Sequence, residues 1–313
     1  MTGVVTRTTG SWHTVTTSAG QVYQCKLKGH FRVRGIRTTN PVAVGDKVDF
    51  EVQGAQDIGV IFNIHPRENY IIRRATKLSK ESHIIAANID QLVLVVTLAF
   101  PRTSTGFIDR VLVTAEAYHI PSVLVFNKID IYPIELMEYL EEIITVYRDA
   151  GYHCLQVSAV SGDGMDQFKS VLENKTSMIA GHSGVGKSTL INVLEPGLNL
   201  KIKEISSYHL KGQHATTFAG MFPLSFGGFI IDTPGIKEFG LIDFNRQEVA
   251  ERFPEMRELM HQCRYNNCTH IHEPGCAVLK AVKSGKIAAS RYENYLRIFY
   301  GRDWDEDKSN YNQ

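Results

Sequence analysis

The sequence lacks any apolar stretch that approaches the roughly 18 to 20 residues of a helical membrane span. Its first residues, MTGVVTRTTGSWH, also lack the apolar core of a secretory signal peptide. Low-complexity runs are absent, and a composition of 43% hydrophobic and 21% charged residues is typical of a globular chain. We therefore expect a cytoplasmic protein that makes no use of a membrane.

Cysteine is scarce, yet three of the five cysteines fall within the stretch CRYNNCTHIHEPGC. These three are Cys263, Cys268 and Cys276. A cytoplasmic chain would not keep a disulfide framework, so the spacing favours a metal site over buried free thiols. Three thiolates and one imidazole would complete the tetrahedral shell of a structural zinc ion. The spacing alone permits His261, His270 or His272 as the nitrogen ligand.

Charge shows no overall excess of either sign, because the formal net charge is +1, but its distribution is uneven. Residues 1–74 carry ten lysines and arginines against five acidic residues. A basic N-terminal module can indicate a polyanionic partner. A chance imbalance on a solvated surface is the alternative.

The length of 313 residues predicts two or three domains. Residues 1–72 contain short alternating runs bounded by turn signals, such as QVYQCKLKG and VGDKVDFEVQG. This pattern favours a small β-barrel of the OB type, which commonly binds nucleic acid. Arg32, Arg34 and Arg37 are then candidates for RNA phosphate contacts. A purely structural barrel is the alternative.

Residues 73–240 contain near-continuous apolar runs, which are typical of parallel strands covered on both faces. These runs are DQLVLVVTLA (90–99), PSVLVFNK (121–128), YHCLQVSA (152–159), TSMIAG (176–181) and GFIIDTPG (228–235). Helical patterns lie between several of them, so we expect a parallel sheet with helices on both faces and ligands at the carboxyl ends of its strands. Residues 241–313 turn helical around the cysteine cluster and end in a polar tail, which predicts a third, zinc-binding domain.

Residues 181–189, GHSGVGKST, fit the phosphate-binding pattern G-x-x-x-x-G-K-[ST] between an apolar strand and a helical pattern. In such a loop the backbone N–H groups cradle phosphates at a helix N-terminus. Lys187 would reach the outer phosphates and Ser188 would ligate Mg²⁺. The expected nucleotide contacts of this loop are Gly181, His182, Ser183, Gly184, Val185, Gly186, Lys187, Ser188 and Thr189.

The tetrapeptide DTPG, residues 232–235, ends another apolar strand. Asp232 would hold Mg²⁺ through water, and the N–H of Gly235 would meet the γ-phosphate. By itself DTPG is a good turn sequence with no further duty. Its position downstream of a phosphate loop favours the nucleotide role.

The motif NKID, residues 127–130, predicts guanine recognition. The carboxylate of Asp130 would accept two hydrogen bonds from the guanine edge, a pair that adenine does not offer. Asn127 would brace the loop, the stem of Lys128 would cover the ring face, and Ile129 completes the motif. The dipeptide Ser158-Ala159 ends the next strand and could offer a backbone N–H to guanine O6.

These motifs come in an unusual order, because the base-reading motif precedes the phosphate loop. The order is that of a GTPase domain cut between DTPG and NKID and rejoined through a linker at 160–175, which is a circular permutation. With the basic barrel, GQHATT and the terminal Cys/His cluster, the chain resembles the circularly permuted GTPases, most closely the ribosome small-subunit-dependent GTPase A family (RsgA, also called YjeQ or YloQ). The resemblance covers nearly all of the chain.

The resemblance selects His270 as the fourth zinc ligand and implies one structural zinc ion per chain. It also points to His214 in GQHATT as the catalytic residue, because Ile236 follows DTPG where many signalling GTPases place a glutamine. The family commonly has a run of threonines after this histidine, whereas Ala215 replaces one here. Either Thr216 or Thr217 could therefore ligate Mg²⁺.

The function implied by the resemblance is a ribosome-stimulated GTPase that binds the small ribosomal subunit and its rRNA and acts in late maturation of that subunit. Two alternatives remain open. One is a permuted GTPase that serves another RNA or protein partner, and the other is a nucleotide-regulated RNA-binding module with negligible turnover. Nothing in the sequence suggests more than a monomer.

Overall fold

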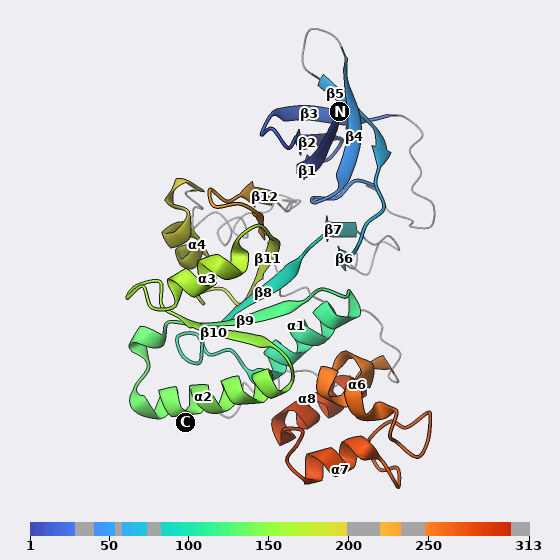
Figure 1. The fold of residues 1–313 in the computed structure, drawn as a ribbon, viewed down its shortest axis with the longest axis vertical. Helices are drawn as coiled ribbons and strands as arrows, with labels where there is room; N and C mark the ends of the chain where they lie inside the picture. Colours follow the sequence, from blue (N-terminus) through green and yellow to red (C-terminus); the bar gives the residue numbers. More distant parts are fainter. Residues whose placement is uncertain (29–40, 54–57, 74–82, 199–219, 233–247, 302–313) are drawn as a thin grey trace, which may run out of the picture.

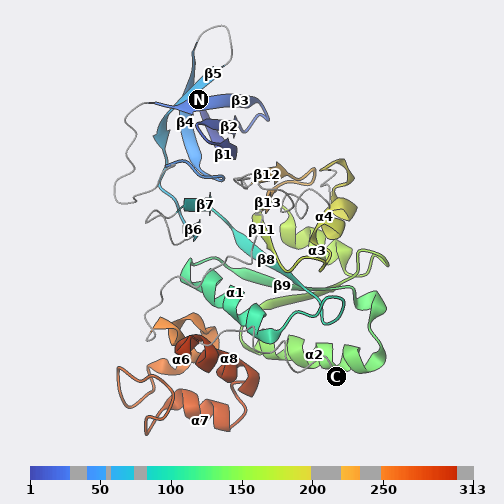
Figure 2. The ribbon, with the colours of Figure 1, turned by 180° about the vertical axis from the view of Figure 1, so that it is seen from behind.

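The computed structural model describes residues 1–313 except 29–40, 54–57, 74–82, 199–219, 233–247 and 302–313. Figure 1 shows three layers along the long axis: a strand-rich N-terminal part, a central sheet with helices, and a helical C-terminal part. The view from behind in Figure 2 shows the same succession. No helix in the described ranges is long and apolar enough to cross a membrane.

The N-terminal part is a closed five-stranded barrel, as predicted. Its strands are β1 (Thr2–Thr9), β2 (Trp12–Thr16), β3 (Val22–Leu27), β4 (Lys47–Gln53) and β5 (Ile58–Ile64). They follow the order β1-β2-β3-β5-β4, and β4 pairs back with β1 to close the barrel. The β3–β5 pair is parallel and the other four pairs are antiparallel, which is the arrangement of an OB fold.

The barrel core is built from alternate residues of its strands, because successive side chains of a strand face opposite sides. In β2 this places His13 and Val15 inside while their neighbours are partly exposed. The apolar residues of the core are Val5, Val15, Cys25, Val42, Val48, Phe50 and Ile61. Burial without a partner for its Nδ1 atom lowers the pKa of His13, and the charge of Asp46 opposes this shift.

The central sheet has the strand order β10-β9-β8-β11-β13-β12. Its strands are β8 (Gln91–Val96), β9 (Ser122–Asn127), β10 (His153–Val157), β11 (Thr176–Ala180), β12 (Gly220–Pro223) and β13 (Phe229–Asp232). All neighbours from β10 to β13 are parallel, as the apolar runs predict, and only β12 is antiparallel. Strand β11 lies in the middle of the sheet although three of its strands precede it in the chain, which is the topology of a permuted domain.

Helices cover both faces of this sheet, and β8 shows why. Leu92, Leu94 and Val96 belong to the core that includes α1 (Thr105–Ala117) and α2 (Ile134–Asp149). Val93 and Val95 belong to the opposite core, which includes α3 (Met165–Leu172) and α4 (Lys187–Leu194). Because β8 is buried on both faces, every residue from Leu92 to Val96 is apolar.

The predicted linker at 160–175 contains helix α3, so it is more than a connection. A separate hairpin of β6 (Tyr70–Arg73) and β7 (His83–Ala87) lies between the barrel and the sheet. The expected boundary at residues 72 and 73 falls within β6, and the division of the chain into domains remains a prediction. Short 3₁₀ turns occur at Ile129–Ile131, Pro196–Leu198 and Ala250–Arg252.

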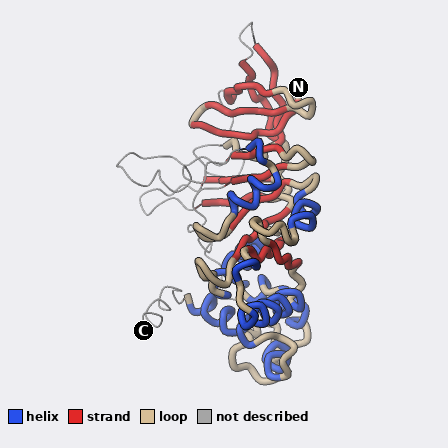
Figure 3. Tube along the Cα trace, turned by 90° about the vertical axis from the view of Figure 1, so that its left-hand side faces the viewer, coloured by secondary structure: helices blue, strands red, loops and turns tan. Residues whose placement is uncertain are grey.

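The C-terminal part contains α6 (Pro254–Met260), α7 (Ala277–Lys283) and α8 (Ala289–Tyr300). Its core gathers Phe253, Met256, Val278, Tyr295 and Ile298 together with Val113 of α1. Figure 3 shows this helical part at the far end of the molecule from the barrel. Because Val113 comes from the central domain, the module packs directly on α1 rather than standing apart.

Candidate functional site

The predicted motifs meet at one edge of the sheet. Strand β11 leads into the phosphate loop, β9 ends at Asn127, and β10 ends just before Ser158. Asp232 ends β13 opposite Ile179 of β11. Because parallel neighbours end at the same edge, the topology brings together motifs that the permuted sequence separates.

The phosphate loop has the backbone of an anion-binding turn. Gly181, Gly184 and Gly186 have φ of +139°, +87° and +95°, and the loop runs into α4. A Cβ on Gly181 would lie 2.2 Å from the carbonyl oxygen of Val95, so only glycine fits there. The Nζ of Lys187 donates to the carbonyls of Gly181 and His182, both at 2.7 Å, which holds its ammonium over the loop.

Asn127 joins the base-reading motif to the phosphate loop. Its Nδ2 donates to the carbonyl of Val185 at 2.8 Å, and both residues are buried. A Cβ on Gly186 would lie 2.4 Å from that same Nδ2, so the close approach depends on glycine. The bracing role expected of Asn127 is therefore consistent with its contacts.

Asp130 is exposed and faces the end of the neighbouring strand. Its Oδ1 accepts a hydrogen bond of 2.5 Å from the hydroxyl of Ser158, which is buried. That hydroxyl also accepts from the N–H groups of Val160 and Ser161 at 3.1 Å. The arrangement leaves the carboxylate of Asp130 held on one side by Ser158 and exposed on the other. Ala159 is half-buried beside it.

Several predicted site residues lie outside the described residues. These are His214, Thr216, Thr217 and Gly235, together with Ile236, Arg32, Arg34 and Arg37. For Asp232 only the backbone is described. Their roles remain predictions. Ser188 and Thr189 lie in the first turn of α4.

The loop between β8 and α1, together with the first turn of α1, forms a wall of the site that no sequence motif indicates. Pro101 lies against Gly184, because a Cβ on that glycine would meet Pro101 Cδ at 3.4 Å. The ring of Phe107 stacks on His182 with 3.8 Å between centroids. Lys128 donates from its Nζ to the carbonyl of Phe100. No motif marks this loop, so only the topology could reveal it.

The Cys/His cluster forms as the resemblance implies. The ligand atoms of Cys263, Cys268, His270 and Cys276 all lie within 4.8 Å of one another. The two sulfurs of Cys263 and Cys276 are 3.9 Å apart, and His270 Nδ1 lies 3.6 Å and 3.4 Å from them. A tetrahedral site with Zn–S bonds of about 2.3 Å has sulfur–sulfur edges of roughly 3.8 Å, so the group fits a metal ion of this size.

Burial shifts the pKa values of side chains in this cluster. It raises the pKa of the Cys268 thiol to about 12 and raises that of Cys276, so the thiolates need a positive charge to form. Burial lowers the pKa of His270, which keeps the imidazole neutral and able to act as a ligand. The carboxylate of Glu273 accepts from the N–H groups of Thr269, Ile271 and His272 and fixes the loop that carries His270.

The C-terminal part with α6, α7, α8 and the Cys/His cluster is called the Cys/His module below. A buried ion-pair network joins this module to the central domain. Arg291 of α8 is 2% exposed and donates to Asp109 of α1 at 2.6 Å and to Glu255 of α6 at 2.7 Å and 3.0 Å. Asp109 is fully buried and also accepts from Tyr147 at 2.8 Å and from Asn294 at 2.6 Å. Every acceptor is thus paired, as a buried charge requires.

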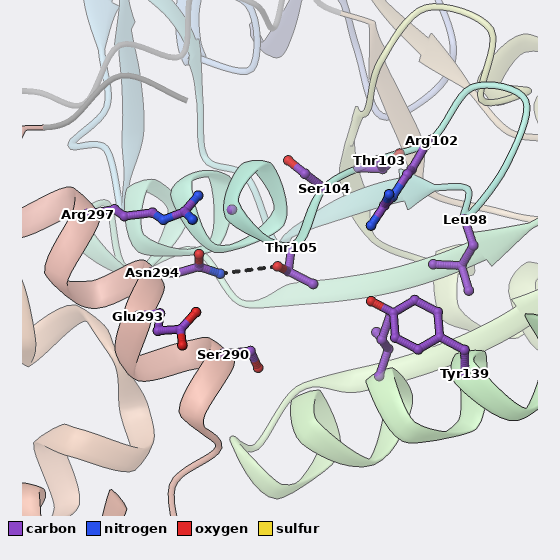
Figure 4. A pocket seen from close by; sticks show the side chains of 12 residues that line it. Leu98, Arg102, Thr103, Ser104, Thr105, Tyr139, Ser290, Glu293, Asn294 and Arg297 are labelled. Carbon is purple, nitrogen blue, oxygen red and sulfur yellow. Dashed lines mark hydrogen bonds between the residues drawn. The ribbon is translucent and has the colours of Figure 1, made fainter. Parts of the chain in front are cut away.

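Beside this network lies a pocket of about 160 Å³ between the start of α1, α2 and α8. Figure 4 shows Arg102 and Tyr139 on one side and Arg297 and Glu293 on the other, with Asn294 bonded to Thr105 between them. None of the residues lining it belongs to a predicted motif. It therefore marks the junction of the module with the central domain rather than the nucleotide edge.

Comparisons with known proteins agree with this geometry. Residues 64–242 match the family described as RsgA GTPase, and residues 2–61 match the family described as RsgA N-terminal domain. The chain is 52% identical to the "Small ribosomal subunit biogenesis GTPase RsgA" of Christiangramia forsetii and 51% identical to that of Bacteroides fragilis, with 97% of each chain covered in both cases.

Solved structures show the same fold. YjeQ from Thermotoga maritima matches with a TM-score of 0.79 at 35% identity, covering 96% of this chain and 97% of that one. YloQ, described as a circularly permuted GTPase, matches with a TM-score of 0.73 at 27% identity, covering 98% and 95%. Sequence, topology and motif order agree over nearly the whole length, and the chain belongs to the RsgA GTPase family.

Proposed function

We propose that this chain binds the small ribosomal subunit and hydrolyses GTP during late maturation of that subunit, and that the subunit stimulates the reaction. The observation that carries the proposal is the convergence of the phosphate loop, the Asn127–Asp130 motif and Ser158 at one sheet edge. The names of the relatives in Christiangramia and Bacteroides supply the partner.

In this proposal Asp130 reads the guanine edge, and Ser158 and Asn127 hold the loop that presents it. The backbone N–H groups of residues 181–189 bind the phosphates, and Lys187 turns its ammonium from the loop carbonyls to the outer phosphates. Mg²⁺ would be held by Ser188, Asp232 and either Thr216 or Thr217. When bound, the ion would neutralise part of the negative charge of the phosphates.

His214 is the proposed positioning group for the attacking water. Its imidazole can accept a hydrogen bond from water, whereas the side chain of Ile236 cannot orient it. The barrel and the Cys/His module are the proposed rRNA contacts. The ion at Cys263, Cys268, His270 and Cys276 is proposed to be zinc with a structural role, because four protein ligands complete its shell.

Multiple-turnover GTP hydrolysis, measured with and without purified small subunits, tests the proposal. We expect slow intrinsic turnover and a clear acceleration by small subunits, which His214→Ala should abolish without a large change in GTP affinity. Acceleration by another RNA or protein but not by the subunit would favour a permuted GTPase with a different partner. Binding with negligible turnover under every condition would favour a nucleotide-regulated RNA-binding module.

A further inference from the structure

The turn that carries the base-reading motif is fastened by a tyrosine that belongs to no nucleotide-binding motif. Strand β9 ends at Asn127, Lys128 adopts a left-handed conformation with φ of +67°, and a 3₁₀ turn covers Ile129–Ile131. Tyr132 then follows, with its own N–H bonded to the carbonyl of Ile129. The side chain of Tyr132 points back toward Asn127, the residue that precedes this turn.

The hydroxyl of Tyr132 makes two buried hydrogen bonds. It donates to the carbonyl of Asn127 at 2.8 Å and accepts from the N–H of Leu98 at 2.8 Å. Asn127 is the last residue of β9, and Leu98 lies just past the end of β8. One hydroxyl therefore ties the base-reading turn to the neighbouring strand end. Burial raises the pKa of Tyr132, so the hydroxyl keeps its proton at working pH.

The turn is thus braced on three sides. Ser158 holds Asp130 from the β10 side, Asn127 holds Val185 from the phosphate-loop side, and Tyr132 holds Asn127 from the β8 side. The first two contacts come from motifs that the sequence analysis identified. The third fixes the backbone from which Asp130 must reach two hydrogen-bond donors at once.

We propose that Tyr132 is a positioning residue for guanine specificity, acting through the backbone of Asn127 on the carboxylate of Asp130. This inference rests on the proposed function, because it takes the base to bind at Asp130. Tyr132→Phe keeps the ring and its packing but leaves the buried N–H of Leu98 and the carbonyl of Asn127 unpaired. A hydrogen bond to a charged group contributes about 1.5–3 kcal/mol, so loss of one bond between the base and Asp130 should lower GDP affinity by roughly 10- to 150-fold.

The test compares GDP with IDP, which lacks the exocyclic amine and offers Asp130 a single hydrogen bond. The unmodified protein should prefer GDP. Tyr132→Phe should reduce this preference, because the misplaced carboxylate loses its second bond. Tyr152→Phe is the matched control: its ring is 6% exposed in the same domain, and its hydroxyl has no hydrogen-bond partner among the described residues. It should leave both affinities unchanged.

Amide hydrogen exchange in the unmodified protein adds a measurement that needs no variant. GDP should slow exchange at Leu98, although Leu98 belongs to no predicted nucleotide-binding motif. The positioning role would be overturned if Tyr132→Phe lost GDP and IDP affinity equally. It would also be overturned if the exchange rate of the Leu98 amide were the same with and without GDP. A lack of guanine preference in the unmodified protein would instead refute the proposed function itself.

Discussion

Replacing Arg291 by methionine should detach the Cys/His module from the central domain. The substitution keeps an unbranched side chain of similar length but removes a guanidinium that is 2% exposed. It leaves Asp109, which is fully buried, and Glu255 without their counter-charge. Removing one partner of a buried ion pair costs about 3–5 kcal/mol, which is at least a hundredfold in the docking equilibrium.

Arg257→Met is the matched control. Arg257 also joins the module to α1, through a 2.8 Å contact with Glu116, but its side chain is 48% exposed. Water screens such a pair, so its removal should cost no more than about 1 kcal/mol. The two variants therefore delete the same kind of contact between the same two parts, and they differ in burial.

The cost of Arg291→Met should also depend on pH. Burial raises the pKa of Asp109, while Arg291 and the hydrogen bonds of its neighbours lower it. Without the arginine the folded-state pKa rises further above its unfolded value. A carboxyl group with a raised pKa destabilises the fold as pH rises, so the penalty should be larger at pH 8 than at pH 5.

Urea denaturation followed by circular dichroism, with hydrogen exchange of the α8 amides, measures these differences. We expect fast exchange throughout α8 in Arg291→Met and near-normal exchange in Arg257→Met. If both variants lose the same stability, or if the stability lost in Arg291→Met relative to the unmodified protein is the same at pH 5 and pH 8, the buried network does not hold the module in place.

The remaining predictions concern the nucleotide, the metal, the barrel and its titration. Asp130→Asn should shift preference from guanine toward xanthine nucleotides, since the amide donates where the carboxylate accepted, and equal ATP and GTP affinity of the unmodified protein would contradict this. Elemental analysis should find one zinc per chain, and Cys268→Ser should unfold the C-terminal module while GTP binding persists. Deleting residues 1–72 should weaken binding to the small subunit, and an unchanged affinity in this deletion variant would indicate a purely structural barrel. Added salt should also weaken binding of the unmodified protein, because counterion release contributes to it. Because burial lowers the pKa of His13, its contribution to barrel stability should be complete above pH 6.5 and lost as the pH falls below that value. His13→Gln should flatten that profile, with the fluorescence of Trp12 as the probe.

The sequence predicted most of the fold because buried parallel strands and glycine-rich loops leave local marks. Strands β8 to β11 and β13 lie within the apolar runs, and the motif order alone indicates the permutation. Helix α3 was missed although Met165, Phe168 and Leu172 have helical spacing and are buried. That signal was present in the sequence and was treated as a linker.

Other features could not be predicted, because they depend on contacts distant in sequence. The sequence pattern predicts Arg291 to be a surface charge on an amphipathic helix, yet it pairs with Asp109, which is 182 positions away in the sequence. Strand β12 has four residues and ends at a proline, so it carries almost no periodic pattern. The stacking of Phe107 on His182 arises from where the topology places the start of α1.

The pairing of β12 with β1 joins the barrel to the edge of the central sheet. Arg7 of the barrel lies opposite Gly220, the first residue of β12, so barrel and central sheet form one continuous hydrogen-bonded surface. A shift of the barrel would therefore be transmitted through backbone hydrogen bonds to β12 at the edge of the central sheet.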